Sequence, residues 1–477
     1  MSTNTTKESR KSTRREFIKA AGLLGIGLVA AQCSAPSPST QPPTAAAPTQ
    51  VPVEKATAPA VLKGTSITVW SFFAQENYQQ WYKFVADEFM KSHPDVTVNV
   101  EYPGFDLITK AKAAIGGGEG IADVYALLPS VFGLESFRSG LLVDLTPYYT
   151  KDAEWQSWTD LWAKIPPGNY RWPHTPDGAI YSSNESLGPS FVWYWADMFE
   201  KLGGFPDTID GLLEAAARAK SDMPDLQGLC SAGFAETWHC DYWYYCLEAK
   251  YDFSGEIARN CVAGKEKWSN PAEIRQGLEL WKRLHDGGLF TPGVMQENYD
   301  PESKTLLKDR KVAMFYSSGP WMSGYTNPGD AAKIGTAYFP KEKAADPNTF
   351  TANNDMGHVI WKISDQQKDQ AYIDLRVEFI KSMASPDSQR LLFQSGIMPV
   401  WSKASDQPIA EDNYEMKVLK QQIDLMTNAD YGVDNNTYYP NETDALDSGM
   451  VEVVLGLKST DQLLTDVDAA QAKDFPA

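Results

Sequence analysis

The order of strand-like and helix-like segments constrains this chain more than any other feature of its sequence. Ser66–Trp70, Val96–Val100 and Ala122–Leu127 are short apolar runs that predict strands. Tyr78–Lys91 and Leu107–Ile115 lie between them and carry apolar residues at helical spacing. Strands that alternate with helices in this way predict an α/β fold, in which helices cover a parallel sheet.

The first residues have the pattern of an export signal. Arg14 and Arg15 precede an apolar run, Ala20–Ala31, whose roughly 12 residues suit a signal peptide and are too few to cross a bilayer. A twin arginine before such a run predicts a twin-arginine signal peptide over residues 1–32. The protein is therefore expected to work outside the cytoplasm.

Cys33 follows the apolar run at the position where a lipoprotein is cleaved and lipidated. Gln32 departs from the small residue usual before that Cys, so cleavage without a lipid is the alternative. Residues 33–64 are rich in Pro, Ala, Ser and Thr, a composition that cannot bury a core and predicts an extended tether. An anchor and a tether would hold the rest of the chain at a membrane surface.

The chain from residue 65 onward is too long for one ordinary core and predicts two lobes. The full sequence has a net charge of −19, which argues against nucleic acid as a partner. It contains 15 Trp, 22 Tyr and 20 Phe, whose rings pack in cores and also stack on the C–H faces of sugars. No motif for a phosphate or a nucleotide cofactor is present, and no cofactor is expected.

Four cysteines lie in one short window of the exported part: Cys230, Cys240, Cys246 and Cys261. An exported protein can join such residues in disulfides, here in any of three pairings, and buried free thiols are the alternative. His239 beside Cys240 is the one hint of a metal site. Neither CxxC nor HExxH spacing accompanies these two residues, so no metal is expected.

Five stretches of the chain match, in order, elements of one known family. They are Ile67–Trp70, Gly120–Val124, Ser139–Pro147, Lys311–Trp321 and Phe379–Met383. Through them the chain resembles the extracellular solute-binding proteins of ABC sugar importers, the family that includes maltose-binding protein. Two positions depart from the family pattern, because Ala122 replaces a usual Pro and Arg310 replaces a usual Gly.

The resemblance implies a two-lobe periplasmic-binding-protein fold of type II, with a hinge and a ligand cleft between the lobes. The chain would cross the hinge near Tyr181–Pro189 and again near Gly335–Pro340. The implied lobes are residues 65–183 with 338–390, and residues 190–335 with 391–477.

The resemblance also implies a ligand site. Trp321 would stack on a sugar ring, while Glu236 would accept hydrogen bonds from hydroxyl groups beside a stacking Trp238. Packing in the core or at the surface is the alternative for each of them. The end of the first strand, the first hinge crossing and two loops provide the other ligand-binding candidates: Trp70, Ser71, Asn184, Glu185, Asn354, Asp355, Tyr438 and Tyr439.

The expected function is that of a monomeric substrate-binding lipoprotein, anchored on the extracytoplasmic side of a membrane. It would capture a mono- or oligosaccharide between its lobes and deliver this carbohydrate to the permease subunits of an ABC importer. No catalysis is expected, because the sequence has no GxSxG, HExxH or dinucleotide motif. A secreted carbohydrate-active enzyme, or a surface sensor or adhesion module on the same fold, is the alternative.

Overall fold

The computed structural model describes residues 64–117, 122–127, 129–161, 178–318, 330–434 and 439–475. These ranges all belong to one unit, Leu62–Ala477. The signal peptide, Cys33 and the tether up to residue 63 lie outside the described residues. None of the described helices is long and apolar enough to cross a membrane.

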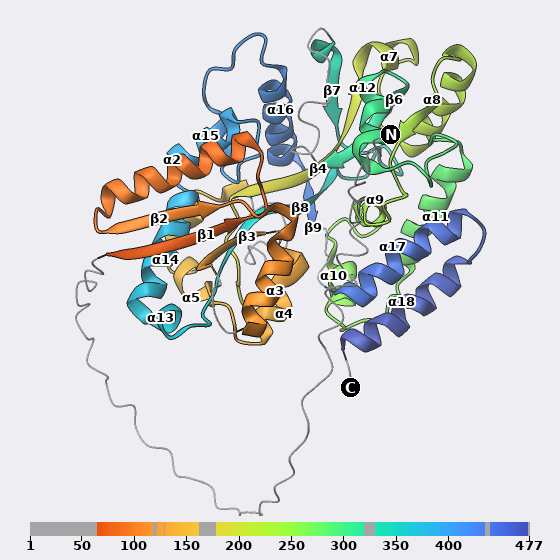
Figure 1. Ribbon diagram of the computed structural model, residues 1–477. Coiled ribbons are helices and arrows are strands. Elements are labelled where there is room, and N and C mark those ends of the chain that lie inside the picture. The colour runs from red at the N-terminus through yellow and green to blue at the C-terminus, as the bar shows by residue number, and fades with distance from the viewer. Residues whose placement is uncertain are drawn as a thin grey trace, which may run out of the picture. The chain divides into compact units, whose positions relative to one another are not determined.

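The first strands and helices follow the predicted order. β1 (Thr65–Ser71) lies between β2 (Val96–Glu101) and β3 (Val124–Leu127) and pairs with both in parallel. α2 (Glu76–Ser92) connects β1 to β2, and α3 (Leu107–Gly117) connects β2 to β3, as Figure 1 shows. The predicted βαβαβ unit is confirmed, and its helices provide the crossover that parallel strands need.

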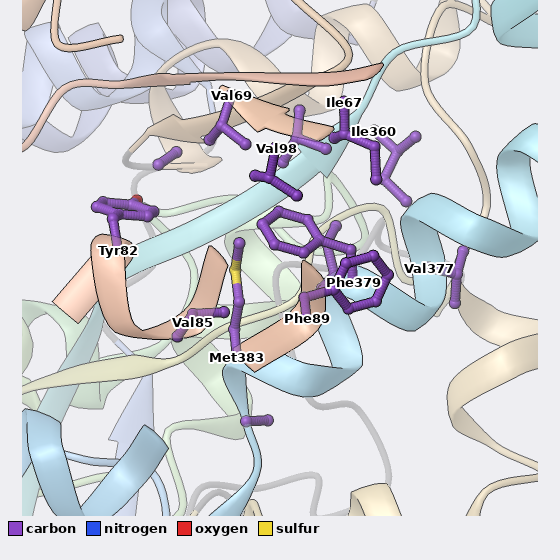
Figure 2. Close-up of a cluster of buried hydrophobic side chains, with 14 of the residues drawn as sticks. Ile67, Val69, Tyr82, Val85, Phe89, Val98, Ile360, Val377, Phe379 and Met383 are labelled. Carbon is purple, nitrogen blue, oxygen red and sulfur yellow. The ribbon is translucent and has the colours of Figure 1, made fainter. Parts of the chain in front are cut away.

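One face of these strands is covered by helices from a distant part of the chain. α14 (Gln370–Met383) and α15 (Pro386–Gln394) pack against α2. Figure 2 shows apolar side chains of α2 and α14 together with those of β1, β2 and β8. Phe89 of α2 meets Phe379 of α14 edge to face, with 5.1 Å between the ring centroids. Burial of apolar surface therefore ties the first strands to helices that the chain forms much later.

A second group of strands follows. β4 (Ser186–Trp195) pairs antiparallel with β6 (Val312–Ser318) and with β7 (Ile334–Ala337). β6 also pairs in parallel with β5 (Gly228–Ser231) on its other side. Every residue of β6 is buried, as expected for a strand with neighbours on both sides and covered faces.

β8 (Thr349–Ile360) joins the two groups of strands. Its last residues, Gly357–Ile360, pair with β3, and its earlier part pairs with β4 and with β9 (Tyr431–Asp434). The strands thereby form one mixed sheet in the order β2-β1-β3-β8-β4-β6-β5. The second passage between the groups lies inside β8 rather than near Gly335–Pro340, because β7 still pairs with β4 there.

The remaining helices pack around these strands. The hydroxyl of Thr208 caps α8 by accepting a hydrogen bond from the N–H of Gly211 at 3.2 Å. α9 is buried along its whole length and packs on β8, α11 and α17. These helices are α4 (Pro129–Arg138), α5 (Thr146–Tyr149), α6 (Ala153–Ser157), α7 (Ala196–Lys201), α8 (Ile209–Asp222), α9 (His239–Glu248), α10 (Glu256–Val262), α11 (Ala272–Asp286), α12 (Lys304–Lys308), α13 (Asp365–Lys368), α16 (Tyr414–Asn428), α17 (Pro440–Val454) and α18 (Thr460–Asp474).

The four clustered cysteines are buried free thiols, so the expected disulfides are not formed in the structure. Cys230 lies in β5 and Cys261 in α10, while Cys240 and Cys246 point to different sides of α9. Proximity in sequence therefore does not bring the sulfur atoms together. Burial raises the pKa of each of these thiols, which keeps them protonated and unreactive.

Leu392→Ala should destabilise the fold far more than Leu457→Ala. Leu392 of α15 is 0% exposed in the apolar cluster behind β1, whereas Leu457 is 74% exposed. A buried cavity should lower the free energy of unfolding by about 2–5 kcal/mol, against at most about 0.5 kcal/mol for the exposed leucine. Urea denaturation of the two variants measures the difference, and equal losses would contradict this packing.

Candidate functional site

Trp238 is a partly exposed aromatic residue directly before α9. Its ring meets the ring of Tyr299 edge to face, with 4.9 Å between centroids, and that of Tyr242 at 5.7 Å. Two buried rings thus hold Trp238 while part of its side chain remains open to solvent. We call Trp238, Tyr242 and Tyr299 the aromatic platform.

Tyr299 is itself held from two directions. Its hydroxyl lies 2.5 Å from Oγ of Ser317, and Nζ of Lys304 lies 4.6 Å from its ring centroid. Lys304 is 1% exposed and forms an ion pair with Asp300 at 3.1 Å. A cation over an aromatic face binds more strongly when it is shielded from water, so Lys304 fixes Tyr299 and, through it, Trp238.

Glu236 places a carboxyl group beside the platform. Burial raises the pKa of this half-buried carboxyl, and the charge of Asp300 adds to the shift. Hydrogen bonds from the backbone of Tyr299 and the charge of Lys304 oppose it. An ionised carboxylate only accepts hydrogen bonds. Glu236 therefore suits a ligand that presents donors, such as hydroxyl groups.

Asn353 of β8 connects the platform to the sheet. Its Nδ2 donates a hydrogen bond to the hydroxyl of Tyr242 at 2.6 Å. Gly188 of β4 makes room for this amide, because a Cβ at that position would lie 2.0 Å from Oδ1 of Asn353. A residue in the middle of the sheet thus positions a ring of the platform.

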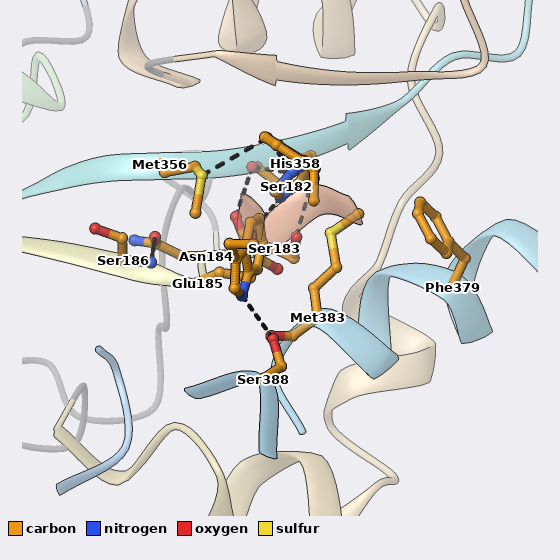
Figure 3. Close-up of polar contacts among 12 residues, drawn as sticks. Ser182, Ser183, Asn184, Glu185, Ser186, Met356, His358, Phe379, Met383 and Ser388 are labelled. Carbon is orange, nitrogen blue, oxygen red and sulfur yellow. Dashed lines mark hydrogen bonds and ion pairs between the residues drawn. The ribbon is translucent and has the colours of Figure 1, made fainter. Parts of the chain in front are cut away.

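Three expected ligand-binding residues, Asn184, Glu185 and Asp355, are buried where the chain enters β4 beside β8. Oε2 of Glu185 pairs with Nδ1 of His358, a contact drawn in Figure 3. Oδ2 of Asp355 accepts a hydrogen bond from Oγ of Ser186 at 2.9 Å. The exposed fractions of Glu185 and Asp355 are 0% and 1%, so these side chains bind protein partners rather than face solvent. We call the set Glu185, Ser186, Asp355 and His358, with Tyr78 and Tyr82 of α2, the seam network.

Trp70 and Ser71 end β1, and the structure separates their roles. The ring of Trp70 stacks on Tyr125 with 5.4 Å between centroids and stays partly exposed. Ser71 is fully buried, and its Oγ accepts a hydrogen bond from the N–H of Phe73 at 3.0 Å. Trp70 keeps a surface that a ligand can reach, whereas Ser71 shapes the turn after the strand.

Tyr439 precedes α17 and contacts Arg138 at the end of α4. Nη2 of Arg138 donates a hydrogen bond to the Tyr439 hydroxyl at 2.8 Å, and its guanidinium carbon lies 5.3 Å from the ring centroid. The ring of Tyr439 is 5% exposed and packs on Phe475 at 4.7 Å. In this structure Tyr439, an expected ligand-binding residue, connects α4 to α17.

Some expected site residues cannot be located. Trp321 and Tyr438 lie outside the described residues, and of Asn354 only the backbone is described, within β8. Within the described ranges, no group of three or more His, Cys, Asp or Glu side chains could hold a metal ion. The ligand-binding candidates with an exposed part are therefore Trp70, Glu236 and Trp238.

Comparison with known proteins shows where this architecture belongs. A family model described as "Bacterial extracellular solute-binding protein" matches residues 74–390, which is more than half of the chain. The chain belongs to the bacterial extracellular solute-binding proteins. The family resemblance carried by the sequence motifs is thus confirmed. A comparison with curated proteins found no match.

Solved structures of other solute-binding proteins share the fold. A chitin oligosaccharide binding protein has a TM-score of 0.63 at 17% identity, covering 85% of this chain and 98% of its own. RafE from Streptococcus pneumoniae, in its apo form, has a TM-score of 0.65 at 16% identity, covering 87% and 99%. The GacH receptor of Streptomyces glaucescens has a TM-score of 0.60 at 18% identity, covering 86% and 98%. The predicted two-lobe type II fold is confirmed.

Sequence reasoning about this solute-binding protein missed Tyr242, Tyr299, His358 and Arg138. Tyr242 follows Trp238 by one helical turn, a spacing that places both on one face and could have indicated the pair. The contacts of Tyr299, His358 and Arg138 join residues far apart in the chain. No local sequence pattern indicates such contacts.

Arg138→Ala and Tyr439→Phe should each weaken this solute-binding protein by about 1 kcal/mol of unfolding free energy, since each removes one hydrogen bond. The double variant should lose less than the sum of the two, because both changes remove the same contact. Urea denaturation of the four proteins in a double-mutant cycle measures this coupling. Strictly additive losses would show that the two residues do not interact in solution.

Proposed function

We propose that this solute-binding protein is the carbohydrate-binding subunit of an ABC importer, anchored outside the cytoplasm by a lipid on Cys33. The observation that carries the proposal is the aromatic platform, with the partly exposed Trp238 beside the carboxyl of Glu236. A sugar offers an apolar ring face to an aromatic side chain and hydroxyl donors to a carboxylate. Trp238 and Glu236 provide both within one short loop.

The family and its neighbours support this assignment. Family members bind solutes outside the cytoplasm, and the matched model spans most of the part that follows the tether. Among proteins of the same fold, RafE was solved with raffinose and the GacH receptor with acarbose. These are binding proteins rather than enzymes, which supports capture and delivery to permease subunits as the role of this chain.

The expected lobes of the proposed binder, residues 65–183 with 338–390 and residues 190–335 with 391–477, change in one respect. The boundary expected at residue 338 would lie in the middle of β8, whose earlier part pairs with β4. The entry into β4 and the middle of β8 would act as the hinge, because these segments pass from the first group of strands to the second. A ligand that contacts both lobes would favour their closure in proportion to its extra affinity for the closed state. A hydroxyl or carboxylate left without a partner in the closed cleft costs about 1–3 kcal/mol, which would provide specificity.

A thermal-shift screen of the purified chain against mono- and oligosaccharides tests the binding activity. A sugar at about 100 times its dissociation constant should stabilise the protein by about 2.7 kcal/mol. Trp238→Ala should abolish the shift, because it removes the exposed ring of the platform. Trp158→Ala is the matched control: Trp158 is also partly exposed, but it packs with Lys381, outside the platform.

The sugar assignment fails if only amino acids, peptides or divalent metals raise the melting temperature. It also fails for this site if Trp158→Ala and Trp238→Ala lose the sugar response equally. Release of the aryl group from aryl glycosides by the purified protein would support the enzyme alternative.

Cys33→Ser should move the exported protein from the membrane fraction to the soluble fraction. A serine cannot take up the thioether-linked lipid, so the proposed anchor is missing once the signal peptide has been cleaved. Membrane fractionation followed by immunoblotting measures the change, with Ser34→Ala as the control that keeps the anchor. A Cys33→Ser chain that stays with the membrane would contradict the lipoprotein assignment.

A further inference from the structure

One arm of the seam network is built around Asp355. Its Oδ2 accepts hydrogen bonds from Oγ of Ser186 at 2.9 Å and from the hydroxyl of Tyr78 at 3.2 Å. Asp355 is 1% exposed, Ser186 is fully buried and Tyr78 is 7% exposed. The ion pairs of the described residues give Asp355 no Lys or Arg partner. A carboxylate so placed is costly to ionise, since burial without a counter-charge disfavours the charged form.

The other arm is built around His358. Its Nδ1 pairs with Oε2 of Glu185, and its Nε2 lies 2.9 Å from the hydroxyl of Tyr82. Glu185 and His358 are 0% exposed, and Tyr82 is 1% exposed. Unlike Asp355, Glu185 thus has an imidazole as its partner.

The arm of Asp355 connects segments that would have to move relative to one another, whereas His358 pairs with β3 and belongs to the first group of strands. Tyr78 and Tyr82 stand on α2, which packs on the first group of strands, while Asp355 and His358 lie in β8. Ser186 begins β4, the first strand of the second group. A rotation of one group against the other would change these contacts and the access of water to the buried carboxyl.

The groups bonded to Asp355 are uncharged hydroxyls, that of Tyr78 from α2 and that of Ser186 from the start of β4. The titratable groups of the other arm, Tyr82, Glu185 and His358, bond to one another. α15 contributes Gln389, whose Nε2 donates to the carbonyl of Glu185 at 3.2 Å and which does not titrate. Burial raises the pKa of Asp355 to about 6, although the bonds from Ser186 and Tyr78 oppose the shift.

We propose that Asp355 couples the opening and closing of the two lobes to the uptake of one proton. The proposal rests on the lobe movement of the proposed function, but it needs no ligand. A proton from solvent binds the carboxyl of Asp355. This protonation favours the conformation in which water does not reach the seam network, called the dry conformation below. Ionisation favours a conformation in which water reaches this carboxylate.

The direction follows from proton linkage. In a conformation open to water, the pKa of Asp355 would lie near its ordinary value of 3.8, against about 6 in the dry network. Between these values the dry conformation binds a proton that the open one does not. The dry conformation is therefore favoured as pH falls below 6, and it loses this advantage as pH rises through 6. The ratio of dry to open molecules should be about tenfold larger at pH 5 than at pH 7.5.

Spin labels on Lys83→Cys in α2 and Asp461→Cys in α18 report the lobe movement in the full chain. Both positions are exposed, the four cysteines of the described part are buried, and Cys33→Ser removes the remaining thiol. Distance distributions by pulsed electron spin resonance, without any sugar, should shift between pH 7.5 and pH 5. Asp355→Asn, a neutral side chain of similar shape, should show one distribution at every pH.

Two further variants keep the test independent of how well Asp355→Asn folds. Tyr78→Phe removes a hydrogen bond that stabilises the carboxylate, so the shift should begin at a higher pH. His93→Gln is the control, because His93 pairs with Glu378 at 3.4 Å outside the seam network; it should shift as the unmodified chain does. A distribution that does not change with pH would overturn the proposal. So would an unaltered shift in Asp355→Asn, or a shift lost in His93→Gln.

The result is separate from the sugar assignment. If the chain binds no sugar but its label distances shift with pH, the proton-linked hinge is supported and the proposed sugar ligand is wrong. If the chain binds sugar and its label distances do not depend on pH, the sugar ligand is supported and the proton-linked hinge is wrong.

Discussion

The structure depends on β8, a single strand that pairs with β3 through one end and with β4 and β9 through the other. A strand that changes partners leaves backbone groups near the change without their regular ladder, and buried backbone groups must find other partners. The pairing of β4 with β8 shifts register between Ser186 and Leu187, at this place. Gln389 of α15 supplies two such partners. Its side-chain amide donates a hydrogen bond to the carbonyl of Glu185 at 3.2 Å and accepts one from the N–H of Val400 at 2.8 Å.

The same strand connects the seam network to the aromatic platform. Asn353 and Asp355 lie two residues apart and hold Tyr242 of the platform and Ser186 of the seam network, respectively. A change in the pairing of β8 would thus alter the contacts of both the platform and the seam network. The platform is held on its other side by Tyr299 and Lys304, which come from a different part of the chain. The proposed ligand contact and the proposed hinge therefore share one short piece of backbone.

The beginning of the fold could be predicted from the sequence because its contacts are local. The parallel unit of β1, β2 and β3 alternates with helices whose apolar spacing is plain, and each element occurs where it was expected. The middle of β8 was expected to be a loop, because Asn353, Asn354 and Asp355 interrupt its apolar pattern. Asn353 and Asp355 fit inside a strand because Tyr242, Ser186 and Tyr78 supply their partners from distant elements. The disulfide expectation failed for a similar reason, because the cysteines are near in sequence but lie on separate surfaces.

The structure gives the expected ligand-binding residues surroundings that no motif indicates. Glu236 and Asp355 are both carboxylates from the same set of expected ligand-binding residues, yet their surroundings differ. Glu236 is half-buried near the opposite charges of Asp300 and Lys304, whereas Asp355 is fully buried and bonded to hydroxyl groups. Burial is the largest cause that raises the pKa of both carboxyls, and it is more complete at Asp355. The same residue type therefore suits hydrogen bonding to a ligand at one position and proton uptake at the other, and only the fold distinguishes the two.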